Sequence, residues 1–202
     1  MVAVIAITLV VGSLRSPISH FGQRARQSAA IGNCKQIVTA LRVYATEHGG
    51  KYPDAIAPLP TSSNQAFRTL IREEVFEDER VFGCQLSKFV PNGKIGGAPD
   101  YLQALEAGEN HWAMTKGVTD QSPGSMPLVF ENPLVPSWPP VWNTKLQEKP
   151  EKGRVWRGGK IIVGFNDTSV QAVKIELPTS DESKKDVFTE AAPFMEVLNI
   201  EG

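Results

Sequence analysis

The distribution of apolar and polar positions divides the first fifty residues into two parts. Residues 1–14 (MVAVIAITLVVGSL) carry no charged side chain. From Ser28 onward the apolar residues recur at the three- and four-residue spacing of a helix with one buried face. These residues are Ile31, Cys34, Ile37, Val38, Leu41, Tyr44 and Ala45. Gly49 and Gly50 should end the helix, because glycine adopts the left-handed conformation of a helix C-terminus without steric cost. We therefore predict one long N-terminal helix, with an anchor part over residues 1–27 and an amphipathic half over residues 28–50.

The anchor part is apolar on every side at its start, so that it needs burial all round. Lipid or neighbouring helices are expected to cover Val4, Ile5, Ile7, Leu9 and Val10. As a helix, residues 1–14 would span roughly 21 Å, which is less than the roughly 30 Å of a bilayer's hydrocarbon core. Pro17 should kink the helix or delay its continuation. A secretory signal is disfavoured because no basic segment precedes the apolar run, and a buried core helix remains the alternative.

The pattern changes again in residues 51–202, which we expect to form one globular head. Capping side chains at residues 62–64, followed by apolar residues at helical spacing, predict a short helix that ends near Glu77. Short apolar runs bounded by Gly, Pro or Asn predict strands at residues 80–84, 111–116, 126–131 and 160–165. An alternating strand is expected around residues 173–177, after a hairpin loop at residues 166–169. The tail after Pro178 could add a final short helix. The sequence thus predicts an α+β fold, with the long helix packed on a small antiparallel sheet.

Composition and charge exclude some classes of function. The net charge is -1, the pI is about 6.3, and Lys and Arg are scattered along the chain. This disfavours nucleic acid as a partner. Two cysteines alone cannot build a metal site. Cys34 and Cys84 are either a disulfide, which would stabilise the fold by about 4 kcal/mol on the chain-entropy model, or two buried free thiols.

Sequence motifs give little support to catalysis. Residues 153–160 (GRVWRGGK) are one residue too long for a phosphate-binding loop and lack its hydroxyl. The three histidines, His20, His48 and His111, stand in no recognisable motif. We expect His48 at the helix end and His111 in packing. The prediction is a protein without catalytic residues and without an organic cofactor.

Residues 133–142 (PLVPSWPPVW) form an unusual proline-rich segment with two tryptophans. Trp138 and Trp142 could form a contact surface for a neighbouring subunit or a glycan. The alternative is that both side chains cover the sheet as a lid.

Residues 30–54 (AIGNCKQIVTALRVYATEHGGKYPD), behind an apolar helix with a proline, resemble a known family. They are similar to type IV pilin-like proteins, and more closely to the major pseudopilins of type II secretion. The residues that match the family pattern are Cys34, Lys35, Gln36, Ile37, Tyr44, Tyr52 and Pro53. The resemblance implies a pilin-like fold and a structural filament subunit, held in the inner membrane by a single transmembrane helix. Its head would lie in the periplasm or outside the cell.

Partners and metal ions follow from the same resemblance. It implies contacts with other pilin-like subunits, membrane lipid, the inner-membrane assembly machinery and, where a leader exists, prepilin peptidase. Related pseudopilins can bind calcium near the C-terminal sheet, which makes Asn166 and Asp167 candidate ligands. Calcium takes roughly six to eight oxygens, however, so a plain turn is the favoured interpretation of this loop.

The sequence departs from the family pattern at its front. Family precursors begin with a short basic leader, and a glutamate follows within the mature helix; neither is present before Pro17. We therefore expect Met1 to be an internal methionine of a longer reading frame. The alternative function is a membrane-tethered extracytoplasmic binding module, for instance for a polysaccharide.

Overall fold

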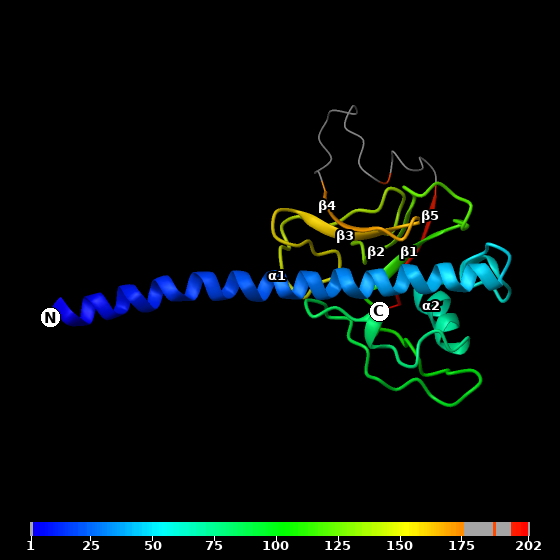
Figure 1. Ribbon diagram of the computed structural model, residues 1–202, viewed down its shortest axis with the longest axis horizontal. Helices are drawn as coiled ribbons and strands as arrows, with labels where there is room; N and C mark the ends of the chain where they lie inside the picture. The colour runs from blue at the N-terminus through cyan, green and yellow to red at the C-terminus, as the bar shows by residue number, and fades with distance from the viewer. Residues whose placement is uncertain (1, 176–187, 189–194, 202) are drawn as a thin grey trace, which may run out of the picture.

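The computed structural model describes residues 2–175, 188 and 195–201, with side chains from residue 22 onward. Its longest element is α1 (Val2–Glu47), a continuous helix of 46 residues. The helix ends where the sequence predicts: the Gly50 N–H donates to the carbonyl of Ala45 at 2.8 Å, and Gly49 and Gly50 have φ angles of 62° and 82°. In Figure 1 the N-terminal part of α1 runs on beyond the head.

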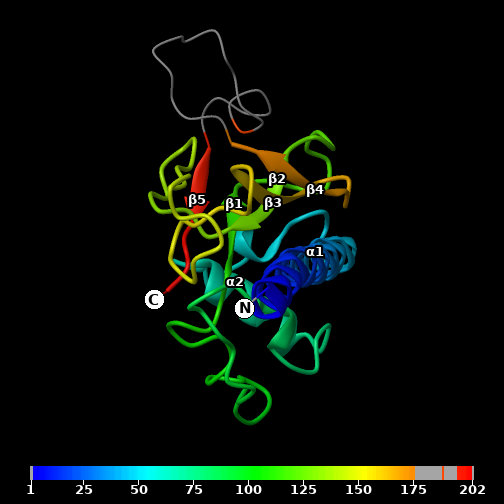
Figure 2. The same cartoon turned by 90° about the vertical axis from the view of Figure 1, so that its left-hand side faces the viewer.

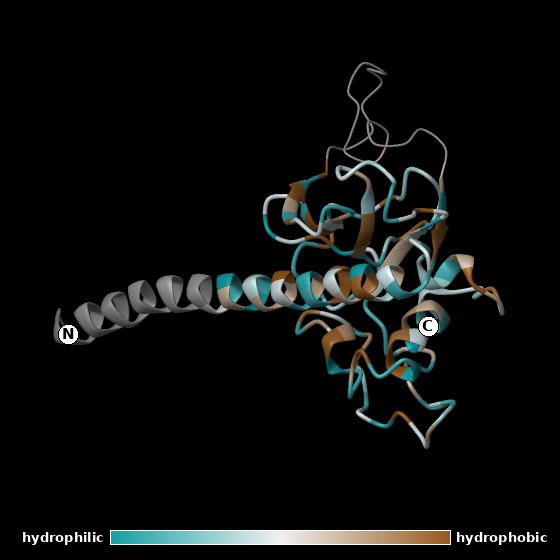
Figure 3. Cartoon of the chain, turned by 45° about the vertical axis from the view of Figure 1, so that its right-hand side comes forward, coloured by the Kyte–Doolittle hydropathy of each residue, from teal (hydrophilic) through white to brown (hydrophobic). Residues whose placement is uncertain are grey.

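One face of the head-proximal half of α1 is buried, as the apolar spacing predicts. The fully covered side chains include Cys34, Ile37, Val38, Leu41 and Ala45. Figure 3 shows apolar and polar residues alternating around this part of the helix. Tertiary packing on this stripe therefore holds the helix to the head.

The head is built on a five-stranded antiparallel sheet. The strands are β1 (Trp112–Lys116), β2 (Pro127–Glu131), β3 (Lys160–Phe165), β4 (Val170–Lys174) and β5 (Glu196–Leu198). Their order in the sheet is β4-β3-β2-β1-β5. Figures 1 and 2 show α1 and α2 (Ser63–Arg72) on the same side of this sheet, and the Ser63 hydroxyl at the start of α2 donates to the Trp112 carbonyl of β1 at 2.9 Å. The fold is the α+β arrangement that the sequence predicts, and it is consistent with a pilin-like topology.

Four local predictions need correction. Pro17 does not delay the helix, since α1 is continuous from Val2 to Glu47 and the proline removes only one backbone donor from it. Residues 80–84 are not a strand: Arg80–Phe82 form the 3-10 helix η2, because the Asp78 carboxylate accepts the Arg80 N–H at 2.8 Å and starts a turn. The α2 helix begins at its predicted cap, Ser62, but ends at Arg72, since Glu74 adopts a left-handed conformation with φ of 55°. Part of the tail is the edge strand β5, in which Leu198 pairs with Met114 of β1.

A further short element follows α1. The 3-10 helix η1 (Pro53–Ala55) begins with a proline, as helix starts often do. Together with the glycine turn, it brings the chain from the end of α1 towards α2.

The helix approaches β3 very closely at Gly164. A Cβ atom at this position would lie 2.6 Å from Val38 Cγ1 and 2.9 Å from Cys34 Sγ. Such distances are well inside van der Waals contact, so only a residue without a side chain allows α1 to seat against the sheet here.

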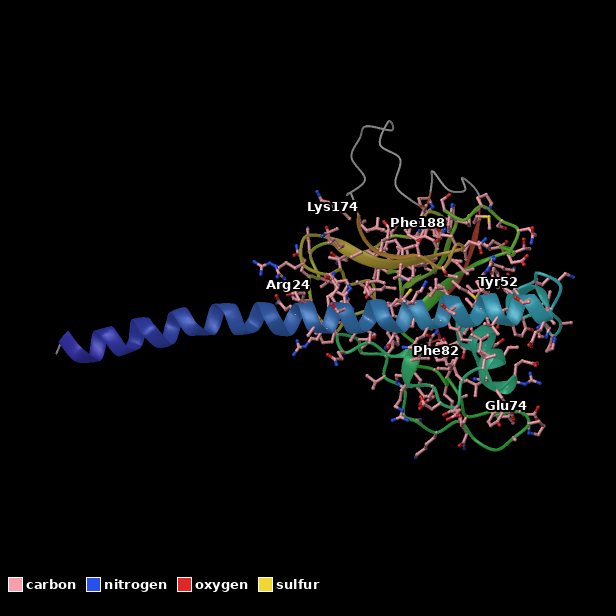
Figure 4. All side chains as sticks on the ribbon, in the orientation of Figure 1. Arg24, Tyr52, Glu74, Phe82, Lys174 and Phe188 are labelled. Atoms are coloured by element: carbon pink, nitrogen blue, oxygen red, sulfur yellow. The ribbon has the colours of Figure 1, made fainter. Side chains whose placement is uncertain are left out.

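The opposite face of the sheet has its own apolar core. Ala113, Phe130 and Val163 from three neighbouring strands are buried there, together with Trp142 and Phe188. The Phe130 and Phe188 rings meet edge to face, with centroids 5.2 Å apart. Figure 4 shows Phe188 beyond the sheet, on the side away from α1.

Candidate functional site

A cluster of buried polar side chains lies where β2 ends. Glu131 is the last residue of β2, and its side chain is 1% exposed. His111 stands immediately before β1, Cys84 follows η2, and Arg154 lies in the segment leading to β3. Four parts of the chain thus meet at one point, which we call the Glu131 cluster: Cys84, His111, Glu131 and Arg154.

The Glu131 carboxylate is the acceptor at the centre of this cluster. Its Oε1 accepts from His111 Nε2 at 3.1 Å, Arg154 Nη2 at 2.9 Å and Trp156 Nε1 at 3.0 Å. Its Oε2 accepts from the Ile162 N–H and from Trp156 Nε1, both at 2.9 Å. Burial alone would raise the pKa of Glu131, but the charge of Arg154 and the hydrogen bonds of His111 and Ile162 lower it below its usual value. The carboxylate is therefore buried in its charged form and fully paired.

His111 has partners on both ring nitrogens. While Nε2 faces Glu131, Nδ1 lies 2.8 Å from Ser87 Oγ and 2.8 Å from Asn132 Nδ2. The Ser87 hydroxyl can accept from a protonated Nδ1, whereas the Asn132 amide can donate to an unprotonated one. An unprotonated Nδ1 can therefore accept from both neighbours, whereas a protonated Nδ1 can donate only to Ser87 and would face the Asn132 amide donor, whose Oδ1 accepts the Gly153 N–H at 3.1 Å. The His111 N–H also donates to the Phe82 carbonyl at 2.9 Å, which fixes the position of its backbone.

The Cys84 thiol completes the cluster. Arg154 Nη2 donates to Sγ at 3.2 Å, and the ligand atoms of Cys84, His111 and Glu131 lie within 4.8 Å of one another. Burial alone would raise the pKa of the Cys84 thiol, but the charge and hydrogen bond of His111 and the charge of Arg154 lower it below its usual value. The pKa of His111 is raised: burial would lower it, and the negative partners Cys84 and Glu131 more than compensate.

Two chemistries suit a cysteine, a histidine and a glutamate at this distance: metal binding and thiol activation. A metal ion fits this set poorly. Glu131 already accepts five hydrogen bonds, which fill its lone pairs. The Arg154 guanidinium contacts both the carboxylate and the sulfur and would repel a cation. An activated thiol fits better, because the same positive groups stabilise a thiolate.

The disulfide that the sequence left open does not form. Cys34 and Cys84 are both buried free thiols, which is the other of the two alternatives left open by the sequence. The two side chains have different neighbours. Cys34 lies on the sheet-facing side of α1 against Gly164, whereas Cys84 contacts Arg154.

The candidate calcium ligands have other partners. Asn166 is 1% exposed; its Oδ1 accepts from the Tyr52 hydroxyl at 2.6 Å, and its Nδ2 donates to the carbonyls of Thr119 and Ser122. Asp167 Oδ1 accepts the Ser169 N–H at 2.8 Å, as expected for a turn. The arrangement supports the plain turn, since it leaves far fewer free oxygens than calcium requires.

The interpretation of the two tryptophans as a contact surface is wrong for Trp142. This side chain is 4% exposed, packs against Phe130 and Phe188, and donates its indole N–H to the Glu131 carbonyl at 3.2 Å. Trp138 is partly buried, and its ring meets Phe188 edge to face. Both residues therefore act as the predicted lid over the far face of the sheet.

Several residues of the family pattern join α1 to the β3–β4 loop. Lys35 Nζ donates to the Thr168 carbonyl at 2.6 Å, and Tyr52 reaches Asn166 from the turn after α1 (Figure 4). Ile37 and Tyr44 are buried, and Gln36 lies on the exposed side of the helix. The pattern thus places structural contacts between helix and sheet. The side chains of the predicted anchor residues, Val4 to Pro17, lie outside the described part.

Comparison of the chain with protein-family models, with curated proteins and with solved structures finds no match. Within the described residues, no helix combines the length and the apolar character needed to span a bilayer.

The Glu131 cluster was missed at the level of sequence, because its members are far apart in the chain. The available signal was Glu131 itself, a charged residue that ends a strand of buried residues.

Proposed function

We propose that the chain is a pseudopilin-like structural subunit of a type IV pilus or type II secretion-type filament. The observation that carries the proposal is the geometry of α1. Figure 1 shows the backbone of α1 extending beyond the head at its N-terminal end, and the Gln23 side chain bonds to Glu148 of the head at 2.5 Å. Residues 2–22 precede Gln23, and their 21 helical residues span roughly 31 Å at 1.5 Å per residue.

A projecting helix of this length suits both environments of such a subunit. Its backbone length approximates the roughly 30 Å hydrocarbon layer of a membrane, although Arg15 falls within it and the uncharged part covers residues 1–14 alone; it can also pack against the helices of neighbouring subunits in a filament. The uncharged sequence of residues 1–14 agrees with burial in either setting. The head-proximal half of the helix is fixed to the sheet, so that movement of the anchor would be transmitted to the head.

Membrane attachment of the full chain tests the first half of this proposal. We expect the protein to sediment with membranes, to resist alkaline carbonate and to dissolve in detergent. Replacement of Leu9 and Val10 by Asp should move it to the soluble fraction, because charged residues are costly in hydrocarbon. The matched control is Thr39→Asp, an exposed position of the same helix. A wild-type chain that is soluble without detergent would contradict the proposal.

Contact between subunits tests the second half. In membranes, an Ile7→Cys variant should form covalent dimers on mild oxidation. The wild-type chain should not, because Cys34 and Cys84 are each less than 10% exposed and neither should reach its counterpart in a second subunit. A chain that stays in the membrane but gives no Ile7→Cys dimers would favour the tethered binding module instead.

A further inference from the structure

The two cysteines of the chain differ in access and in surroundings. Cys34 is 0% exposed and Cys84 is 9% exposed. Cys84 borders a surface groove of about 250 Å³, which is also lined by Asn33, Arg80 and Val90. The Cys34 thiol is thus covered by α1 and the sheet, whereas Cys84 lies beside a groove that is open to solvent.

We propose that Cys84 is a nucleophilic thiol that exchanges with low-molecular-weight disulfides entering this groove, with His111 as the base that takes its proton and Arg154 as the group that stabilises the thiolate. The proposal rests on the geometry of the Glu131 cluster. Arg154 Nη2 donates to the sulfur at 3.2 Å, and His111 is held within reach of it by its bond to Glu131. The proposal does not depend on the function proposed above.

The charges of the cluster balance in the reactive state. A Cys84 thiolate and the Glu131 carboxylate supply two negative charges, and a His111 imidazolium and the Arg154 guanidinium supply two positive ones. A neutral group of this kind can be buried at much lower cost than an isolated thiolate. The lowered pKa of Cys84 and the raised pKa of His111 agree with this distribution. For Cys34, burial raises the pKa well above the usual thiol value, and the charge of Glu131 adds to it.

The reaction is a simple exchange. His111 takes the proton of the Cys84 thiol, and the thiolate attacks one sulfur of the incoming disulfide. A bond forms between Sγ and that sulfur while the original sulfur–sulfur bond breaks. The second sulfur leaves with the electron pair as a thiolate, which is protonated by solvent. Cys84 is oxidised to a mixed disulfide and the leaving group is reduced, so that no further reactant is needed.

The groove indicates the class of disulfide. Arg80 supplies a positive charge at its edge, although Asp78 pairs with this guanidinium at 2.5 Å. Asn33 and Gln85 add amide groups, and Val90 with Pro91 forms an apolar wall. Because the Arg80–Asp78 pair carries no net charge, this lining favours a small, polar disulfide over a purely apolar one, and loss of Arg80 would leave the negative charge of Asp78 unpaired at the edge.

Reaction with dithiobis(nitrobenzoate), an anionic aryl disulfide, tests the proposal on the folded full chain. We expect one thiol per chain to react before unfolding, Cys84→Ser to abolish this reaction, and Cys34→Ser to retain it. As the pH falls, the rate should decline at a lower pH than for N-acetylcysteine amide in the same buffer. His111→Gln should slow the reaction about tenfold near neutral pH and move this decline to higher pH.

Controls separate activation from a loss of folding. The exposed variant Arg80→Gln should react about threefold more slowly with dithiobis(nitrobenzoate) but normally with the neutral dithiodipyridine. The proposal is overturned if Cys84 reacts only on unfolding, or if its pH dependence matches that of N-acetylcysteine amide. It is also overturned if the purified protein retains zinc that protects Cys84, because the cluster would then be a metal site.

Discussion

The close contact between α1 and the sheet at Gly164 gives a quantitative prediction. Gly164→Ala would place a methyl carbon 2.6 Å from Val38 Cγ1, where unstrained carbons lie roughly 3.5–4.0 Å apart. Relief requires a shift of about 1 Å between a helix and a sheet that are both fully packed. Overpacking of this kind costs about 1–3 kcal/mol. We therefore expect Gly164→Ala to lower the free energy of unfolding by about 2 kcal/mol, measured by denaturant unfolding followed through tryptophan fluorescence.

A second substitution shows whether this contact is the cause. Val38→Ala alone should cost about 1–3 kcal/mol, because it removes buried methyl groups and leaves a cavity. In the double variant the new methyl group occupies the space that Val38 leaves, while its 2.9 Å approach to Cys34 Sγ remains, so that the combined loss should be smaller than the sum by about 1 kcal/mol. As a control, Gly32→Ala should stabilise the helix slightly, since nothing lies within 4 Å of its Cβ position. Strict additivity of the two losses would refute the assignment of the strain to this contact.

The remaining predictions concern the cluster, the lid and a helix cap. Glu131→Gln should destabilise the fold by about 3–5 kcal/mol, because it leaves Arg154 buried without its anion. The pKa of Glu131 is lower in the folded state than in the unfolded state. The ionised carboxylate therefore stabilises the fold above the unfolded-state pKa, and this stabilisation is lost as the pH falls through the folded-state pKa. Below about pH 4.5, the melting temperature of the wild type should fall more steeply than that of the variant. Trp142→Ala should cost about 3–5 kcal/mol, whereas Val135→Ala, at an exposed position, should leave the melting temperature nearly unchanged. Ser62→Ala should cost about 1 kcal/mol, because the Ser62 hydroxyl caps α2, and an unchanged denaturation midpoint would contradict that role.

The parts of the fold that were predictable from sequence are those where one pattern determines the structure. The buried stripe of α1 follows from the spacing between Cys34 and Ala45, and three strands follow from uninterrupted apolar runs, such as residues 160–165. Residues 80–84 carry a similar local pattern, yet a side-chain bond from Asp78 turns them into η2. A hydrogen bond between a side chain and a nearby backbone N–H depends on the local backbone conformation, and the spacing of apolar residues does not predict it.

The Glu131 cluster shows the same limit for function. Each of its members has an ordinary local explanation, and His111 in particular was expected only to pack. These residues come together because the register of β1 with β2 sets Trp112 opposite Glu131. The segment that leads into β3 then brings Arg154 to the same place. A contact made by four distant segments becomes visible only once the sheet is assembled.

The Glu131 carboxylate influences both cysteines of the chain. Cys34 lies on the helix face that packs against the sheet, and the charge of Glu131 helps to raise its pKa. Arg154 and His111 oppose the same charge at Cys84. The Glu131 carboxylate thus favours the protonated thiol at Cys34. At Cys84 it favours the thiolate indirectly, because it holds Arg154 and His111 in place beside the sulfur. Loss of Glu131 should therefore reduce the difference in reactivity between the two cysteines. If Glu131→Gln remains folded, slower exchange at Cys84 without new reactivity at Cys34 would show that the carboxylate acts through these partners, and unchanged exchange would show that it does not.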